Sequence, residues 1–147
     1  MTIDFERMMK EQYDLQVAMY NGQHPGASDN PEERVAYIKD MALAALDEVH
    51  EALGEVGWKP WAKSRHINRD AFVSELIDTM QFVMNMFAAV DADAEEVCTK
   101  LFKKHLINWQ RLNGYTGLEK CKKCKRALDD LTTHCEPGHC MDDKATT

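Results

Sequence analysis

The chain has 147 residues, of which 44% are hydrophobic and 29% are charged. This length allows one compact domain with a small appendage, and the composition is that of a globular protein rather than a disordered or fibrous one. The formal net charge of −7 argues against nucleic acid as a partner, because phosphate backbones are bound by clustered Lys and Arg.

A cytoplasmic location is expected from the distribution of apolar residues. Residues 1–6 are acidic and contain no apolar signal core. The longest apolar stretch, residues 80–90, is interrupted by Gln81 and Asn85. Both features are unlike those of secretory signals and membrane spans, so we expect a chain that does not enter the membrane.

The first predicted helix covers about residues 4–21. Met8, Leu15 and Met19 recur at helical spacing on one face, and Gln12 and Gln16 fall on the same side. Two amides on a buried face require polar partners.

A loop and a second helix follow. Residues 22–29 are rich in Gly, Pro and Asp, which is typical of a loop, and this loop is a natural mouth for a pocket. Asn30 is an expected N-cap, with Pro31 at the first helical position and Glu33 completing a capping-box pattern. The helix is expected to run to about residue 55.

The third predicted helix, about residues 70–90, is apolar around most of its circumference. Such a pattern is typical of a central, buried helix. Its few polar residues, Glu75, Asp78, Gln81 and Asn85, share the remaining sector.

A fourth helix is expected to start near Asp93, with Glu96 in a capping-box position, and to end at residues 113–114, an Asn-Gly pair. No segment shows sustained alternation of apolar and polar residues, so no sheet is expected. The predicted fold class is therefore all-α, a bundle of four main helices. We expect residues 1–115 to form this domain and residues 116–147 a separate tail.

Two pairs of acidic residues are candidate metal ligands. Glu48 with Glu51, and Glu75 with Asp78, are each spaced i, i+3, which places each pair on one side of its helix. Ionised carboxylates that face a core need raised pKa values or bound cations, and oxygen ligands favour Mg²⁺ or Mn²⁺. About two or three such ions would offset the charge of four acids and a triphosphate.

Two other interpretations of the acids stay open. They could form a solvated helix face, although the apolar character of the helix that carries Glu75 and Asp78 disfavours this. They could also belong to a di-iron bundle, since Asp47 and His50 share the i, i+3 spacing. Such sites use Glu-x-x-His on two helices, and the second acidic pair has no His.

Four segments together carry a resemblance to a known family: LDEVHEAL (46–53), WKPW (58–61), ELID (75–78) and FVMNMF (82–87). They resemble the all-alpha dUTPase and phage dCTP/dUTP pyrophosphatase family of the MazG-like superfamily. The likeness covers about residues 8–115.

The resemblance implies an enzyme that splits a deoxynucleoside triphosphate into the monophosphate and pyrophosphate. It implies Mg²⁺ bound by the four acids, with Glu48 or Glu51 as the base that assists a metal-activated water. The expected substrate is dUTP or dCTP. Family members often have His where Gln81 stands, so a purine triphosphate, dGTP or dATP, is the alternative.

The resemblance also implies substrate-binding residues and an assembly. The nucleoside would be held by Gln12, Gln16, Asn21, Trp61 and Asn85, and the phosphates by Lys59, Lys63, Lys104, Arg111 and Tyr115. Taken singly, each basic residue could equally be a solvated surface charge. A homodimer or larger homo-oligomer is expected, because four helices with one so apolar make a thin bundle.

The tail is expected to bind a structural Zn²⁺. Its cysteines have spacings suited to a tetrahedral site, and His134 or His139 could replace one of the later two: Cys121, Cys124, Cys135 and Cys140. Since the tail has few apolar residues, the metal would supply its folding free energy. A zinc-containing nucleic-acid-binding module without catalysis is the rival function.

Overall fold

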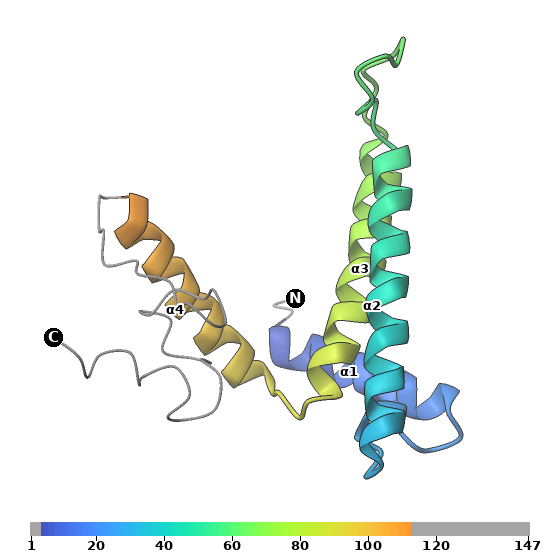
Figure 1. The fold of residues 1–147 in the computed structure, drawn as a ribbon, viewed down its shortest axis with the longest axis vertical. Coiled ribbons are helices and arrows are strands. Elements are labelled where there is room, and N and C mark those ends of the chain that lie inside the picture. The colour runs from blue at the N-terminus through green and yellow to red at the C-terminus, as the bar shows by residue number, and fades with distance from the viewer. Residues whose placement is uncertain (1–3, 113–147) are drawn as a thin grey trace, which may run out of the picture. The chain divides into compact units, whose positions relative to one another are not determined.

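The computed structural model describes residues 4–112, without the side chains of residues 110 and 111. This part contains four α-helices, α1 (Phe5–Met19), α2 (Pro31–Gly54), α3 (Arg69–Ala88) and α4 (Ala94–Leu112), and a short 3-10 helix, η1 (Pro25–Ala27) (Figure 1). Within it there is no strand, only an isolated antiparallel bridge between Val56 and Ile67. The all-helical prediction is therefore confirmed for the described residues.

Side-chain caps define where three of the helices begin. The backbone N–H of Arg7 donates to Asp4 Oδ1 at 2.7 Å at the start of α1. Asn30 Oδ1 accepts from the N–H of Glu32 at 3.0 Å at the start of α2. Such bonds satisfy backbone donors that have no partner within the helix. The predicted cap of the fourth helix is also found, because the N–H of Glu96 donates to Asp93 Oδ1 at 2.8 Å.

The helices α2 and α3 pack against each other as an antiparallel pair, and α1 packs on α3 (Figure 1). Small side chains let the helix backbones approach closely: Ala45 and Ala52 on α2 and Ala89 after α3 are all buried. Gly26 of η1 lies against Ala89, where an added Cβ would come within 2.7 Å of the Ala89 Cβ. The loop before α2 is thereby held against the C-terminal end of α3.

Residues 55–68 form an ordered connector between α2 and α3. The N–H of Gly57 donates to the carbonyl of His66 at 2.9 Å, beside the bridge between Val56 and Ile67. The Arg65 guanidinium donates to three backbone carbonyls of the same loop, those of Gly57, Lys59 and Pro60. The connector is thus closed by its own backbone and by one arginine.

Two expectations about burial differ from the structure. On α1 the buried side chains are Gln12 and Gln16, whereas Leu15 and Met19 are 47% and 63% exposed. The helix turns its amides rather than these apolar residues toward its neighbours. In α3, which was expected to be central, Leu76 is 43% exposed, because α1 and α2 cover only part of its surface.

The chain divides into two units between Val97 and Cys98. Helix α4 crosses this point and is described by itself; its large apolar residues Leu101, Phe102 and Leu106 are exposed. None of the helices within residues 4–112 is long and apolar enough to cross a membrane. The predicted domain boundary after residue 115 lies outside the described residues and stays a prediction.

Candidate metal and nucleotide site

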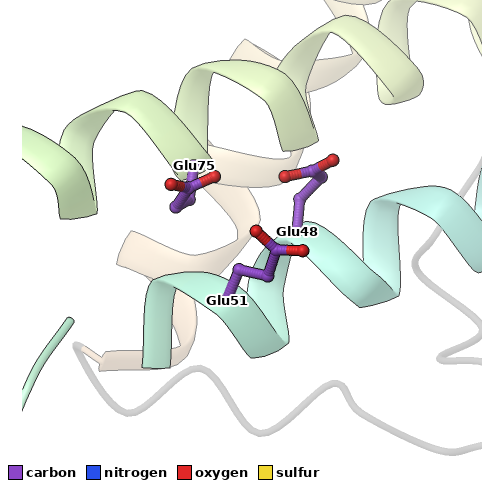
Figure 2. A group of neighbouring side chains, drawn as sticks. All are labelled: Glu48, Glu51 and Glu75. Carbon is purple, nitrogen blue, oxygen red and sulfur yellow. The ribbon is translucent and has the colours of Figure 1, made fainter. Parts of the chain in front are cut away.

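Three of the four predicted metal ligands meet between α2 and α3. One carboxylate oxygen each from Glu48, Glu51 and Glu75 lies within 4.8 Å of the others. Figure 2 shows Glu48 and Glu51 reaching from α2 toward Glu75 on α3. The i, i+3 spacing on α2 supplies two acids one turn apart, and the packing of α3 brings the third.

Glu48 lies under the electrostatic influence of the neighbouring acids. Its pKa is raised above the ordinary value, first by partial desolvation and then by the charges of Glu51 and Asp78. A hydrogen bond with Glu75 and the charge of Glu75 add to the shift. Asp78 stands outside the 4.8 Å group, yet its charge acts on Glu48, so all four predicted acids share one neighbourhood.

This donor set fits a hard divalent cation. None of the four acids forms an ion pair with Lys or Arg anywhere in residues 4–112. Clustered carboxylates without a cationic partner repel one another until a cation binds, and oxygen ligands from two helices suit Mg²⁺ or Mn²⁺. The di-iron alternative is not supported, because Asp47 and His50 are exposed and outside this group.

A second cluster joins three of the predicted nucleoside-binding residues. Gln12 Nε2 on α1 donates to Asn85 Oδ1 on α3 at 3.0 Å. Gln16, one turn further along α1, accepts at Oε1 from the Tyr37 hydroxyl at 2.9 Å. Gln12, Gln16 and Asn85 are all buried, with Asn85 only 1% exposed. These three residues are called the amide cluster below.

The other two predicted nucleoside-binding residues are exposed and lie outside the amide cluster. Asn21 follows the end of α1, is exposed, and has a φ of 57°, in the left-handed region. Trp61 lies in the connector and is 77% exposed. Within the described residues, neither side chain joins the amide cluster.

Three residues of this region were missed in the sequence: His24, Tyr37 and Met41. Tyr37 and Met41 precede the buried Ala45 on α2 at four-residue steps, a spacing that would have placed them on its inner face. Asn85 Nδ2 lies 3.4 Å from Met41 Sδ. His24 carries no comparable signal, since it lies in a loop and its burial depends on contacts with distant helices.

His24 is an internal part of the fold. Its ring stacks on Tyr13, with centroids 4.5 Å apart and planes 5° apart, and meets Tyr37 edge-on. Its Nδ1 accepts from the N–H of Gly26 at 3.1 Å, whereas Nε2 is buried without a partner. Burial lowers the pKa of this imidazole, so it is neutral. The predicted pocket mouth is also found, because loop residues around His24 line a cavity of about 560 Å³.

The predicted phosphate-binding residues are spread over the chain. Lys59 and Lys63 are exposed in the connector, and the Lys59 ammonium lies 5.7 Å from the Trp58 ring centroid. Lys104 lies on α4, in the other unit. The Arg111 side chain, Tyr115 and the predicted zinc ligands Cys121, Cys124, Cys135 and Cys140, with His134 and His139, lie outside the described residues.

Comparison with known proteins decides the family. A family model described as dUTPase matches residues 4–135. The chain belongs to this dUTPase family. It is thus a nucleoside triphosphate pyrophosphohydrolase of the dCTP/dUTP pyrophosphatase type.

Two phage proteins are similar to this dUTPase family member. The dCTP pyrophosphatase of Enterobacteria phage T4 is 26% identical over 138 residues, covering 74% of this chain and 80% of the relative. The dCTP pyrophosphatase of Enterobacteria phage LZ5 is 25% identical over 138 residues with the same coverage. No solved structure gives a significant match.

Proposed function

We propose that this chain is a magnesium-dependent pyrophosphohydrolase that converts dCTP or dUTP into the monophosphate and pyrophosphate. The observation that carries the proposal is the convergence of Glu48, Glu51 and Glu75 from two helices, with Asp78 beside them. Mg²⁺, when bound by these acids, supplies charge neutralisation for the phosphates and activation of a water. Two or three ions, with Mn²⁺ as a substitute, would suit four acids.

The acids have separate roles in this proposal. Glu75 and Asp78 act as metal ligands from α3. Glu48 and Glu51 act as ligands from α2, and one of them accepts the proton of the attacking water. Both glutamates lie within the same group of carboxylates, so either is placed to take this proton.

The amide cluster supplies the nucleoside end of the proposed site. Asp78 and Asn85 are seven residues apart on α3, which corresponds to about 10 Å along a helix axis. A nucleotide whose phosphates lie at the acids can therefore extend its sugar and base toward Gln12, Gln16 and Asn85. Asn21 and Trp61 are further nucleoside contacts in this proposal, although the connector that carries Trp61 lies at the end of the α2–α3 pair away from Asn85 (Figure 1).

The choice of dCTP or dUTP rests on the family and the relatives. The family model is that of a dUTPase, and both phage relatives are dCTP pyrophosphatases. Amide groups can pair with the edge of a pyrimidine, although they also suit a purine. Purine triphosphates therefore remain the alternative to be tested.

The phosphates are assigned in this proposal to cationic and hydroxyl groups. Lys59 and Lys63 would reach them from the connector, which begins one turn after Glu51 on α2. Lys104, Arg111 and Tyr115 are the further residues proposed to bind the phosphates.

We also propose a homodimer or larger homo-oligomer. Large apolar side chains are exposed on the two helices that carry the acids: Leu43, Leu46, Val73, Leu76, Ile77 and Met80. Burial of such side chains against a second copy would remove them from water. Light scattering coupled to size-exclusion chromatography should give at least twice the 16.9 kDa mass of one chain; a monomer at assay concentration would reject this part of the proposal.

A substrate screen tests the proposal. The purified chain is incubated with Mg²⁺ and each of dCTP, dUTP, dTTP, dATP and dGTP, and nucleotide loss is followed by anion-exchange chromatography. The expected result is fastest turnover of dCTP or dUTP. Faster turnover of dGTP or dATP would reject the pyrimidine assignment while keeping the enzyme class.

A further inference from the structure

The amide cluster has a fixed orientation that depends on α2. Gln12 and Gln16 lie one turn apart on α1 and are 8% and 6% exposed. Each uses one amide atom inside the protein, Nε2 in Gln12 and Oε1 in Gln16. An amide has one donating and one accepting end, so the internal partner of each decides which end remains for a ligand.

The sulfur atom of Met41 determines which end of the Gln12 amide remains for a ligand. A thioether sulfur only accepts, so the group that Asn85 turns toward Met41 Sδ at 3.4 Å is its amino group. The carbonyl oxygen of Asn85 then faces Gln12, which must offer Nε2 to it. Gln12 Oε1 is thereby left as an acceptor.

The Tyr37 hydroxyl determines which end of the Gln16 amide remains for a ligand. Tyr37 is 7% exposed, and burial raises its pKa to about 12, so it keeps its proton. Within residues 4–112, Gln16 Oε1 is the hydrogen-bond partner of that hydroxyl. The phenol proton therefore goes to Gln16 Oε1, and Gln16 Nε2 is left as a donor.

The two remaining amide atoms are available to a ligand. In the described part of the chain, Gln12 Oε1 and Gln16 Nε2 have no protein partner. Neither is sealed from solvent, since the buried polar side-chain atom without a partner there is His24 Nε2. Two largely buried side chains, a helical turn apart, thus keep one acceptor and one donor that are not fully enclosed.

We propose that Tyr37 and Met41 are positioning residues that fix this acceptor–donor order and so determine which base edge the enzyme accepts. The inference rests on the proposed function, in which Gln12 and Gln16 hold the base. Uracil presents a donor at N3 and an acceptor at O4, whereas cytosine presents an acceptor at N3 and a donor at N4. In a base held in one orientation, a fixed order of amide atoms therefore complements one of the two pyrimidines and not the other. Tyr37 and Met41 act through the amides, because their own polar atoms are already used by Gln16 and Asn85.

The test compares Tyr37→Phe with Tyr13→Phe. The first substitution frees Gln16 to rotate, whereas Tyr13 is 38% exposed, makes no side-chain hydrogen bond in the described residues, and keeps its ring stack on His24 as Phe. Tyr37→Phe should raise KM for the preferred triphosphate about tenfold, the size expected for one misdirected hydrogen bond, with kcat little changed. It should also reduce the kcat/KM ratio between preferred and competing bases, while Tyr13→Phe changes neither.

Met41→Leu provides a second variant that retains volume and removes the sulfur, with Met19→Leu, 63% exposed, as its control. Met41→Leu should lower the kcat/KM ratio between preferred and competing bases, as Tyr37→Phe does. Unchanged selectivity in both Tyr37→Phe and Met41→Leu, or an equal loss of rate for every triphosphate, would overturn the inference while the wild type remains active. A wild type that hydrolyses no triphosphate would instead overturn the proposed function, and this inference with it.

Discussion

The side chain of Gln12 on α1 donates to Asn85 Oδ1 on α3 at 3.0 Å, although the two residues are 73 positions apart in the sequence. Together with the bond between Tyr37 and Gln16, this contact ties α1 to the α2–α3 pair through polar groups. The residues that dock α1 are therefore the same ones proposed to hold the nucleoside. Substitutions there should change stability and substrate affinity together.

Asn85→Ala tests this coupling. The substitution leaves Gln12 Nε2 buried without an acceptor, which should lower the free energy of unfolding by about 1–3 kcal/mol. It should also raise KM for the triphosphate. Urea denaturation and steady-state kinetics measure the two effects. Gln23→Ala, at an exposed side chain without a hydrogen bond in the described residues, should change neither; a fully stable Asn85→Ala protein would show that the contact does not hold α1.

The metal centre is tested by Glu75→Gln and Asp78→Asn. Each amide keeps the shape of the acid and removes the charge that binds Mg²⁺, so turnover should fall by about two orders of magnitude or more. Circular dichroism should be unchanged. Asp47→Asn is the matched control, because Asp47 is an exposed acid beside Glu48 and outside the carboxylate group. Near-normal activity in either test variant would mean that the metal site lies elsewhere.

Zinc in the tail is a prediction from cysteine spacing alone. Protein purified without chelators should contain about one zinc per chain. The double substitution Cys121→Ser and Cys124→Ser should remove it. Cys98→Ser, at a half-buried free cysteine of α4, should retain the full amount. Metal analysis by mass spectrometry decides, and zinc-free wild-type protein with an intact tail in a protease digest would contradict the prediction.

The burial of His24 predicts that the folded protein loses stability on acidification. Its pKa in the folded state is lowered by burial from the ordinary 6.5, so protons bind the unfolded chain more tightly. The stability contributed by neutral His24 is complete above about pH 6.5 and declines as the pH falls toward the folded-state pKa. Melting temperatures between about pH 8 and 5 should fall more for the wild type than for His24→Phe, whose ring retains the stack on Tyr13.

The control for that comparison is His66→Gln, at an exposed histidine of the connector. Its melting temperature should follow that of the wild type across the range. Parallel curves for the wild type and His24→Phe would show that His24 protonation does not affect folding.

Much of the helical framework could be predicted from local signals. Asn30 and Asp93 are helix caps in the structure as in the sequence, because capping depends on neighbours within one turn. The meeting of Glu48, Glu51 and Glu75 follows from i, i+3 spacing plus the pairing of two helices.

The features that could not be predicted from the sequence depend on contacts between distant segments. Leu15 and Met19 fall on the apolar face in a helical projection, yet they are exposed, because α1 meets its neighbours through Gln12 and Gln16. The roles of Tyr37 and His24 arise from a hydrogen bond and a ring stack that join separate elements. No periodicity within one segment encodes such pairs.

The reaction products distinguish magnesium-dependent pyrophosphate release from other phosphate hydrolysis. The wild-type chain is incubated with Mg²⁺ and its preferred triphosphate, with and without a chelator, and all phosphorus-containing products are quantified by ³¹P NMR. We expect nucleoside monophosphate and pyrophosphate in equal amounts, and no reaction with the chelator present. Release of orthophosphate with the diphosphate, or hydrolysis that persists without divalent cations, would contradict it.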